Sequence, residues 1–230
     1  MWDLVKITIE LAEVISAIIC FVLVWFMMKP YRLTGENSFL GLPLGFGIMG
    51  ASHIIATAVG FSTDLAWFWF MVIFRTFSFL FLATTYLFAS RASKKSHYLL
   101  NITLSTTIVV LFTLSLLVFI APQLWSSFGS SQIYWRIFIV ICLSYIIIVT
   151  LRNHVKKPDR MTLWIPFGFI FLTASQCLLI VYASVYKIIE NSINVYWIAV
   201  GFRFAGLIMF LIVAYRTYYN SKEDDNVKNS

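Results

Sequence analysis

Charged residues are scarce in this sequence. Asp, Glu, Lys and Arg make up 12% of the 230 residues, whereas hydrophobic residues make up 60%. Soluble globular domains carry about 25% charged residues, so this composition excludes a soluble domain. Nucleic-acid binding would need a soluble basic surface with aromatic or polar readers of the bases, and no segment offers one.

Cysteine, histidine and lysine are missing where cofactor chemistry would need them. The three cysteines lie in hydrophobic segments without metal-ligand spacing: Cys20, Cys142 and Cys177. Only one histidine, His53, lies in such a segment, which leaves haem without a pair of axial ligands at one level. The last hydrophobic segment has no lysine for a retinal Schiff base, and no Ser-His-Asp set is apparent. We therefore expect no cofactor and no metal, and we do not expect an enzyme.

Long hydrophobic segments are what the sequence does have. A membrane helix needs about 20 mostly apolar residues to cross about 30 Å of hydrocarbon. Seven segments meet this requirement, at residues 7–28, 39–61, 65–90, 98–121, 132–151, 162–186 and 194–218. They predict an all-α polytopic membrane protein. Residues 1–220 are predicted to form one seven-helix domain, and residues 221–230 a short disordered cytoplasmic tail.

The distribution of positive charge predicts the orientation. Twelve of the seventeen Lys and Arg residues lie on one side, in alternate connections or at the end of the last segment: Lys29, Arg32, Arg91, Lys94, Lys95, Arg152, Lys156, Lys157, Arg160, Arg216, Lys222 and Lys228. The connections on the other side carry only Lys6 and Lys187. Short loops rich in Lys and Arg stay in the cytoplasm. The N-terminus is therefore predicted outside the cell membrane and the C-terminus inside.

One short pattern occurs twice. Residues 43–53 and 166–176 are identical at five of eleven positions, at an offset of 123. A Phe-Arg pair follows each copy, first Phe74-Arg75 and then Phe202-Arg203, at an offset of 128. The five extra residues fit the connection before the last segment, because loops tolerate insertions. Chance similarity is the alternative in a chain so rich in Phe and Ile.

The pattern predicts a 3+1+3 internal repeat of seven transmembrane helices. Residues 7–90 and 132–218 would be the two copies, and residues 98–121 the linker helix. Because each copy has three crossings and the linker helix adds a fourth, both copies run through the membrane in the same direction. This arrangement is similar in architecture to that of the SWEET sugar transporters and of the seven-helix rhodopsins.

The glycines of the second segment have two interpretations. Gly45, Gly47 and Gly50 match the dinucleotide-binding fingerprint, but they lie inside a hydrophobic segment with no strand before it. Gly41 and Gly45 have GxxxG spacing, which favours close packing of membrane helices. We expect the second.

Six polar residues are predicted to share a layer in the outer half of the bundle: Glu10, Glu13, His53, Arg75, Gln176 and Arg203. An arginine in hydrocarbon costs a few kcal/mol or more, so it is either paired or in use. One interpretation is a set of structural ion pairs and interhelical hydrogen bonds. The other is a site for a small polar or anionic ligand, since arginine binds carboxylates through two parallel hydrogen bonds.

Three functions fit these features. The first is a receptor or sensor that binds a small polar or anionic ligand, in the lipid bilayer and with a possible membrane-protein partner. The second is a transporter of a small solute or protons, built on the parallel repeat. The third is an accessory or structural subunit of a larger membrane complex. We favour the receptor, because the inner halves of the segments are apolar and a carrier needs a hydrated route on both sides.

Overall fold

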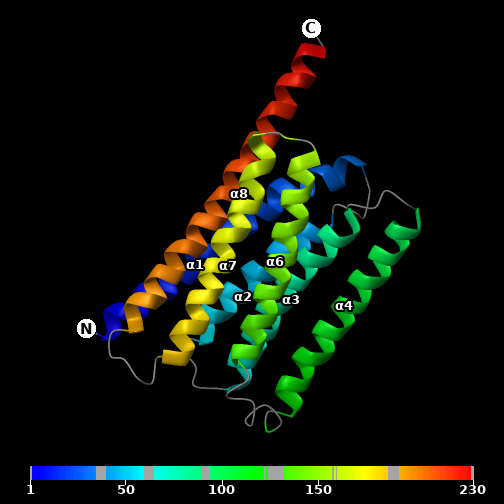
Figure 1. Ribbon diagram of the computed structural model, residues 1–230. Helices are drawn as coiled ribbons and strands as arrows, with labels where there is room; N and C mark the ends of the chain where they lie inside the picture. Colours follow the sequence, from blue (N-terminus) through cyan, green and yellow to red (C-terminus); the bar gives the residue numbers. More distant parts are fainter. Residues whose placement is uncertain are drawn as a thin grey trace.

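Long α-helices account for nearly all of the structure. The computed structural model describes residues 2–34, 40–59, 65–89, 94–121, 123, 132–156, 158, 160–185 and 192–228. Within these residues there are seven helices: α1 (Trp2–Thr34), α2 (Gly41–Val59), α3 (Leu65–Ala89), α4 (Lys94–Ile120), α6 (Gln132–Lys156), α7 (Arg160–Val185) and α8 (Ser192–Lys228) (Figure 1).

Each of these helices contains an apolar stretch long enough to cross a membrane. The stretches run from 18 to 25 residues, which matches the length required by about 30 Å of hydrocarbon. Their large exposed side chains are aliphatic and aromatic, such as Phe112 and Leu116 on α4, as a lipid-facing surface requires. The predicted all-helical, multi-pass membrane fold is therefore confirmed, and such a bundle lies in a lipid bilayer.

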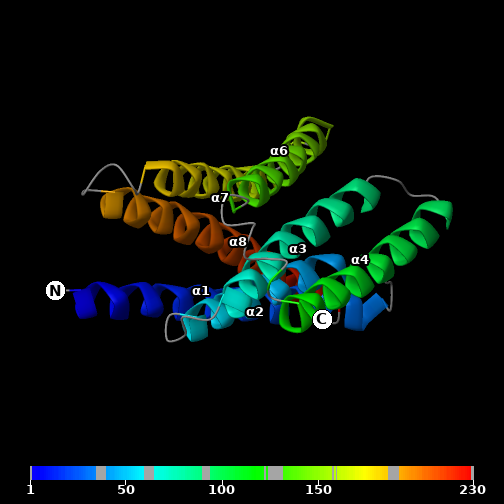
Figure 2. The ribbon, with the colours of Figure 1, turned by 90° about the horizontal axis from the view of Figure 1, so that it is seen from below.

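Six of the helices form a closed ring. The principal contacts join α1 to α2, α2 to α3, α3 to α6, α6 to α7, α7 to α8, and α8 back to α1. Figure 2 shows α3 and α8 lying between the α1–α2 pair and the α6–α7 pair. The remaining helix, α4, packs against α3 on the outside of the ring. We call the end where α1, α3, α6 and α8 begin the amino end of the bundle.

Glycines allow the helices of the ring to approach closely. A Cβ built on Gly45 of α2 would lie 2.6 Å from Cδ2 of Leu82 on α3. A Cβ built on Gly206 of α8 would lie 2.8 Å from the backbone oxygen of Gly168 on α7. Apolar side chains gain nothing by leaving lipid for each other, so membrane helices associate through such close packing. Close packing is thus the role that the structure gives to Gly45.

Towards the carboxyl end of α1, the ring is filled by apolar side chains. All six ring helices contribute to this cluster, which we call the apolar plug: Cys20, Leu23, Phe46, Met49, Phe79, Leu82, Ala83, Ile139, Cys142, Leu143, Ile146, Phe169, Leu172, Leu207 and Phe210. Several of these residues, including Phe169 and Leu207, are completely buried. The amino end of the same ring holds the polar groups described below.

The last helix is longer than the hydrophobic segment that predicted it. α8 continues through Lys228, whereas a disordered tail was predicted from residue 221; residues 229 and 230 lie outside the described residues. Residues 218–228 contain neither Gly nor Pro. Because an existing helix adds residues without repeating the cost of nucleation, such a polar segment can remain helical beyond the membrane.

Candidate functional site

Glu13 is the centre of a buried charged cluster. Its Oε1 accepts a hydrogen bond from Nη1 of Arg203 at 2.7 Å, and its Oε2 lies 3.2 Å from Nη2 of Arg75. The same Oε2 lies 2.5 Å from Nδ1 of His53. One carboxylate thus joins α1 to α2, α3 and α8. We call these four residues the Glu13 cluster.

The helix periodicity of α1 explains why Glu13 points inward. The buried positions of α1 recur every three or four residues: Ala12, Glu13, Ser16, Ala17, Cys20 and Leu23. This spacing places them on one face of the helix, so Glu13 is on the face that packs into the ring. Only 5% of Glu13 is exposed, and 7% of Arg203. Buried charges of this kind must be paired, because desolvation is costly.

Gln176 is not part of the Glu13 cluster but lies beside a third arginine. Its Oε1 accepts a hydrogen bond from Nη1 of Arg136 at 3.4 Å, across the contact between α6 and α7. Arg136 lies in the first turn of the segment predicted at residues 132–151, and it is not among the six residues of the predicted layer. Its offset of 123 from Glu13 was the signal that could have identified it.

Glu10 lies one helical turn before Glu13 on α1. Its Oε1 is buried, and no hydrogen bond to it is formed within the described part of the chain. The structure therefore assembles Glu13, His53, Arg75 and Arg203 directly, pairs Gln176 with Arg136, and leaves Glu10 as a separate carboxylate.

A polar cavity lies beside the Glu13 cluster. It is lined by Glu13, Arg75, Arg136, Ser175, Leu179, Tyr196, Val200 and Arg203, and about 40 Å³ is open to the centre of a water-sized sphere. A single water needs about 10–15 Å³ by this measure. The cavity is therefore large enough for about three waters, or for one anion of a few atoms. We call it the arginine cavity.

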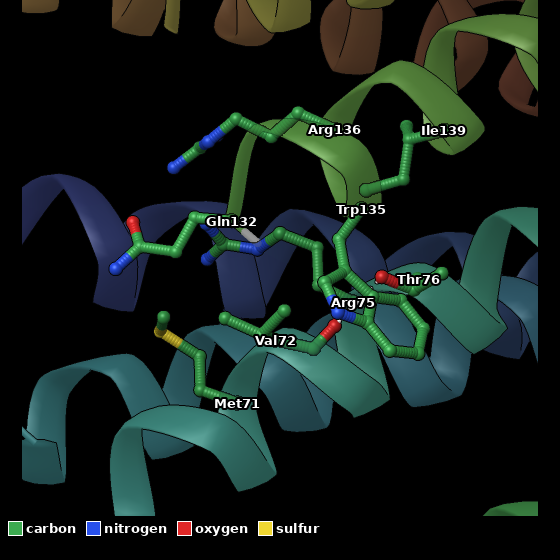
Figure 3. Close-up of a pocket in the computed structure, with 8 residues that line it drawn as sticks. All are labelled: Met71, Val72, Arg75, Thr76, Gln132, Trp135, Arg136 and Ile139. Carbon is green, nitrogen blue, oxygen red and sulfur yellow. Dashed lines mark hydrogen bonds between the residues drawn. The ribbon is translucent and has the colours of Figure 1, made fainter. Parts of the chain in front are cut away.

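A second, smaller cavity lies next to Arg75 and Arg136. It has about 20 Å³ of comparable space, between α3 and α6, and is lined by Met71, Val72, Arg75, Thr76, Gln132, Trp135, Arg136 and Ile139. Figure 3 shows Arg75 and Arg136 entering this space from the two facing helices. Because Arg75 and Arg136 line both cavities, the two cavities are neighbours.

Several buried donors of the site have no acceptor among the described residues. They are Nε of Arg75, Nε and Nη2 of Arg203, and Oγ of Ser175. Arg203 lines the arginine cavity and uses only Nη1 to bind Glu13. Buried polar groups normally have partners, so these donors mark a place where an acceptor would be stabilised.

These features define the class of the protein. It is a multi-pass α-helical membrane protein with an arginine-rich polar cluster on the amino-end side of an apolar plug. Within the described residues, no group of His, Cys, Asp or Glu side chains is arranged to hold a metal ion. Comparison with known proteins gives no match: no family model, no curated protein and no solved structure is significantly similar to this chain.

Proposed function

We propose that this protein is a receptor-like membrane protein that binds a small anion in the arginine cavity and does not catalyse a reaction. The observation that carries the proposal is the imbalance of charge around the cavity. Three guanidinium groups line it, from Arg75, Arg136 and Arg203, but only one carboxylate does, from Glu13. An anion there would accept hydrogen bonds from donors that are already buried and lack acceptors in the described residues.

The orientation proposed for the bundle makes the cavity accessible from outside the cell. Twelve of the seventeen Lys and Arg residues belong to the end opposite the amino end, and such residues remain cytoplasmic. The amino end, with Glu13 and the arginine cavity, would then face outward. The apolar plug would separate the site from the cytoplasm.

α8 provides a connection from this site to the cytoplasm. It carries Arg203, which binds Glu13, and it continues past the end of its apolar stretch at Thr217 to Lys228. An anion that binds the unpartnered Nε and Nη2 of Arg203 would lie beside Glu13, which binds Nη1. If the free and bound states differ in the position of α8, the ligand would shift the equilibrium between them, and a membrane-protein partner could detect this change.

The proposed internal repeat supports a central site. Under the offset of 128, Trp69-x-x-Val72-x-Phe74-Arg75 corresponds to Trp197-x-x-Val200-x-Phe202-Arg203. The helix contacts correspond as well: α1–α2 with α6–α7, α2–α3 with α7–α8, and α3–α6 with α8–α1. Gly45 meets Leu82 and Gly168 meets Phe210, which are equivalent contacts under the two offsets. Duplicated halves place their shared site at the interface between them.

The same repeat favours one second candidate, a carrier of small anions. Parallel repeats can rock against each other around a fixed central site. The apolar plug counts against this function, because a carrier would have to open a route through it. Uptake of labelled anions by reconstituted vesicles would support the carrier.

A thermal-shift screen of the purified protein in detergent tests the proposal. A ligand that binds only the native state raises the melting temperature, by an amount that grows with its concentration. We expect at least one small anion to do so, and Arg203→Gln to abolish the shift. The matched control is Arg216→Gln on the same helix, because Arg216 is exposed. If no anion shifts the melting temperature of the unmodified protein, the cluster is structural only.

A further inference from the structure

The two halves of the site correspond residue by residue. With the two offsets, Glu13 corresponds to Arg136, His53 to Gln176, Ser52 to Ser175, and Arg75 to Arg203. The contact between Glu13 and His53 joins α1 to α2, and the contact between Arg136 and Gln176 joins the equivalent α6 to α7. The polar groups of the two halves are therefore placed alike, although their chemistry differs.

The first half contains its own anion, and the second half does not. In the first half, Glu13 accepts hydrogen bonds from the arginine of each half, Arg75 and Arg203. In the second half, the position of Glu13 is taken by Arg136, and its neighbour Gln176 is a neutral amide. The second half thus has two guanidinium groups and no carboxylate.

Three of the four buried donors of the site that lack acceptors among the described residues belong to the second half, and the fourth is Nε of Arg75. Ser52 donates its hydroxyl to the backbone oxygen of Met49 at 2.7 Å, so its hydrogen bond is made within its own helix. The equivalent hydroxyl, on Ser175, is buried and has no partner in the described residues, and it lines the arginine cavity. Arg203 in turn has Nε and Nη2 unpartnered.

These two nitrogens of Arg203 form one edge of the guanidinium group. Their N–H bonds are parallel, and this edge matches the two oxygens of a carboxylate. A halide can accept from both N–H groups only at a single point, so the two hydrogen bonds converge and bend, whereas the two oxygens of a carboxylate accept one straight bond each. The geometry of the unpartnered donors therefore favours a planar oxyanion.

The charge of the cavity favours an anion, and its size limits that anion to a few atoms. Glu13 contributes −1, and Arg75, Arg136 and Arg203 contribute +3, which gives +2 around the cavity. A monoanion would reduce this excess to +1. The available 40 Å³ corresponds to about three water-sized molecules, which is the size of formate or acetate.

We infer that the second half takes its missing carboxylate from the ligand, a small monocarboxylate held by Arg203, Arg136 and Ser175. This inference rests on the proposed function and narrows it to one ligand class. The carboxylate of Glu13 in the first half then corresponds to the carboxylate of the ligand in the second half.

Titration with formate and with acetate, at constant ionic strength, tests this inference through the melting temperature. Ser175→Ala should weaken the apparent affinity for acetate by about tenfold, the effect of losing one hydrogen bond to a charged group. Ser52→Ala is the matched control, because its hydroxyl bonds within its own helix; it should leave the affinity unchanged.

A second variant supplies the missing carboxylate directly. Gln176→Glu would place an acidic group where Oε1 now lies 3.4 Å from Arg136. We expect this variant to melt at a higher temperature without ligand and to lose its response to acetate. If it fails to fold, the serine pair still decides the question.

The outcomes separate this inference from the proposed function. A response to halide or sulfate but not to formate or acetate would overturn the carboxylate inference and keep anion binding. Equal acetate affinities in the two serine variants would overturn the assignment to the second half. No response to any anion would overturn both.

Discussion

The Glu13 carboxylate should contribute more to stability than any other single acidic group in the membrane region. We consider Glu13→Gln, which keeps the volume of the side chain and removes its charge. The variant leaves Arg75 and Arg203 buried without a counter-ion, although each now bonds to Glu13, at 3.2 Å and 2.7 Å. His53 loses its contact at the same time.

The loss of stability in Glu13→Gln can be estimated from these three contacts. Interhelical hydrogen bonds in membrane proteins contribute about 0.6 kcal/mol each, so three give a lower estimate of ~2 kcal/mol. Removing one partner of a buried ion pair costs ~3–5 kcal/mol, which gives the upper estimate. With about 2–4 °C of melting temperature per kcal/mol for a protein of this size, we expect a decrease of roughly 4–20 °C.

The assay is the fraction of protein that remains monodisperse in detergent after heating, measured by fluorescence-detected gel filtration. Glu10→Gln is the matched control, since Glu10 lies on the same helix and the described residues provide no hydrogen bond to its buried Oε1. We expect the control to melt within about 2 °C of the unmodified protein, as expected for a change of about 0.5 kcal/mol. Equal losses in the two variants would refute the assignment of Glu13 as the centre of the cluster.

Three further predictions concern the helix packing, the Glu13 cluster and the orientation of the bundle. Gly206→Ala should destabilise the protein by ~1–3 kcal/mol, because its Cβ would lie 2.8 Å from the backbone oxygen of Gly168; Gly201→Ala on the same helix, with nothing within 4 Å, should be neutral or slightly stabilising in the same melting assay. Glu13→Ala should regain melting temperature on addition of formate, and chloride at the same ionic strength should not replace it. A fluorescent protein fused after residue 230 should fluoresce in cells, because the proposed orientation puts the carboxyl end in the cytoplasm; activity of alkaline phosphatase at the same position would instead place that end outside.

The limits of the seven helices could be predicted from local sequence. Each apolar segment ends where charges or turn residues begin, and the observed helices differ from the predicted segments by a few residues at most ends; α8 is the exception. Gly45 could be assigned to close packing for the same reason, since only small residues allow membrane helices to touch. The extension of α8 to Lys228 could not be predicted from its polarity, because helix propagation depends on the preceding turns.

The contacts between residues of the site could not be predicted from the positions of the segment ends alone. Glu10 and Glu13 were predicted in one layer, and their spacing of three puts them on the same side of α1. Only the packing of α3 and α8 decides that Arg75 and Arg203 contact Glu13, one turn further along the helix. Arg136 looked like a residue of a first turn, and its contact with Gln176 depends on how α6 packs against α7.

By itself, the sequence determined that the described residues form seven helices long and apolar enough to cross a membrane, and that these helices contain arginines. The reason is that hydrocarbon imposes a length and a composition on every segment that enters it. Only the tertiary structure decided that one carboxylate binds two of the arginines and that a third lines the same cavity. Such contacts join residues far apart in the chain, and their geometry depends on the rotation and crossing of packed helices, which hydrophobicity does not encode.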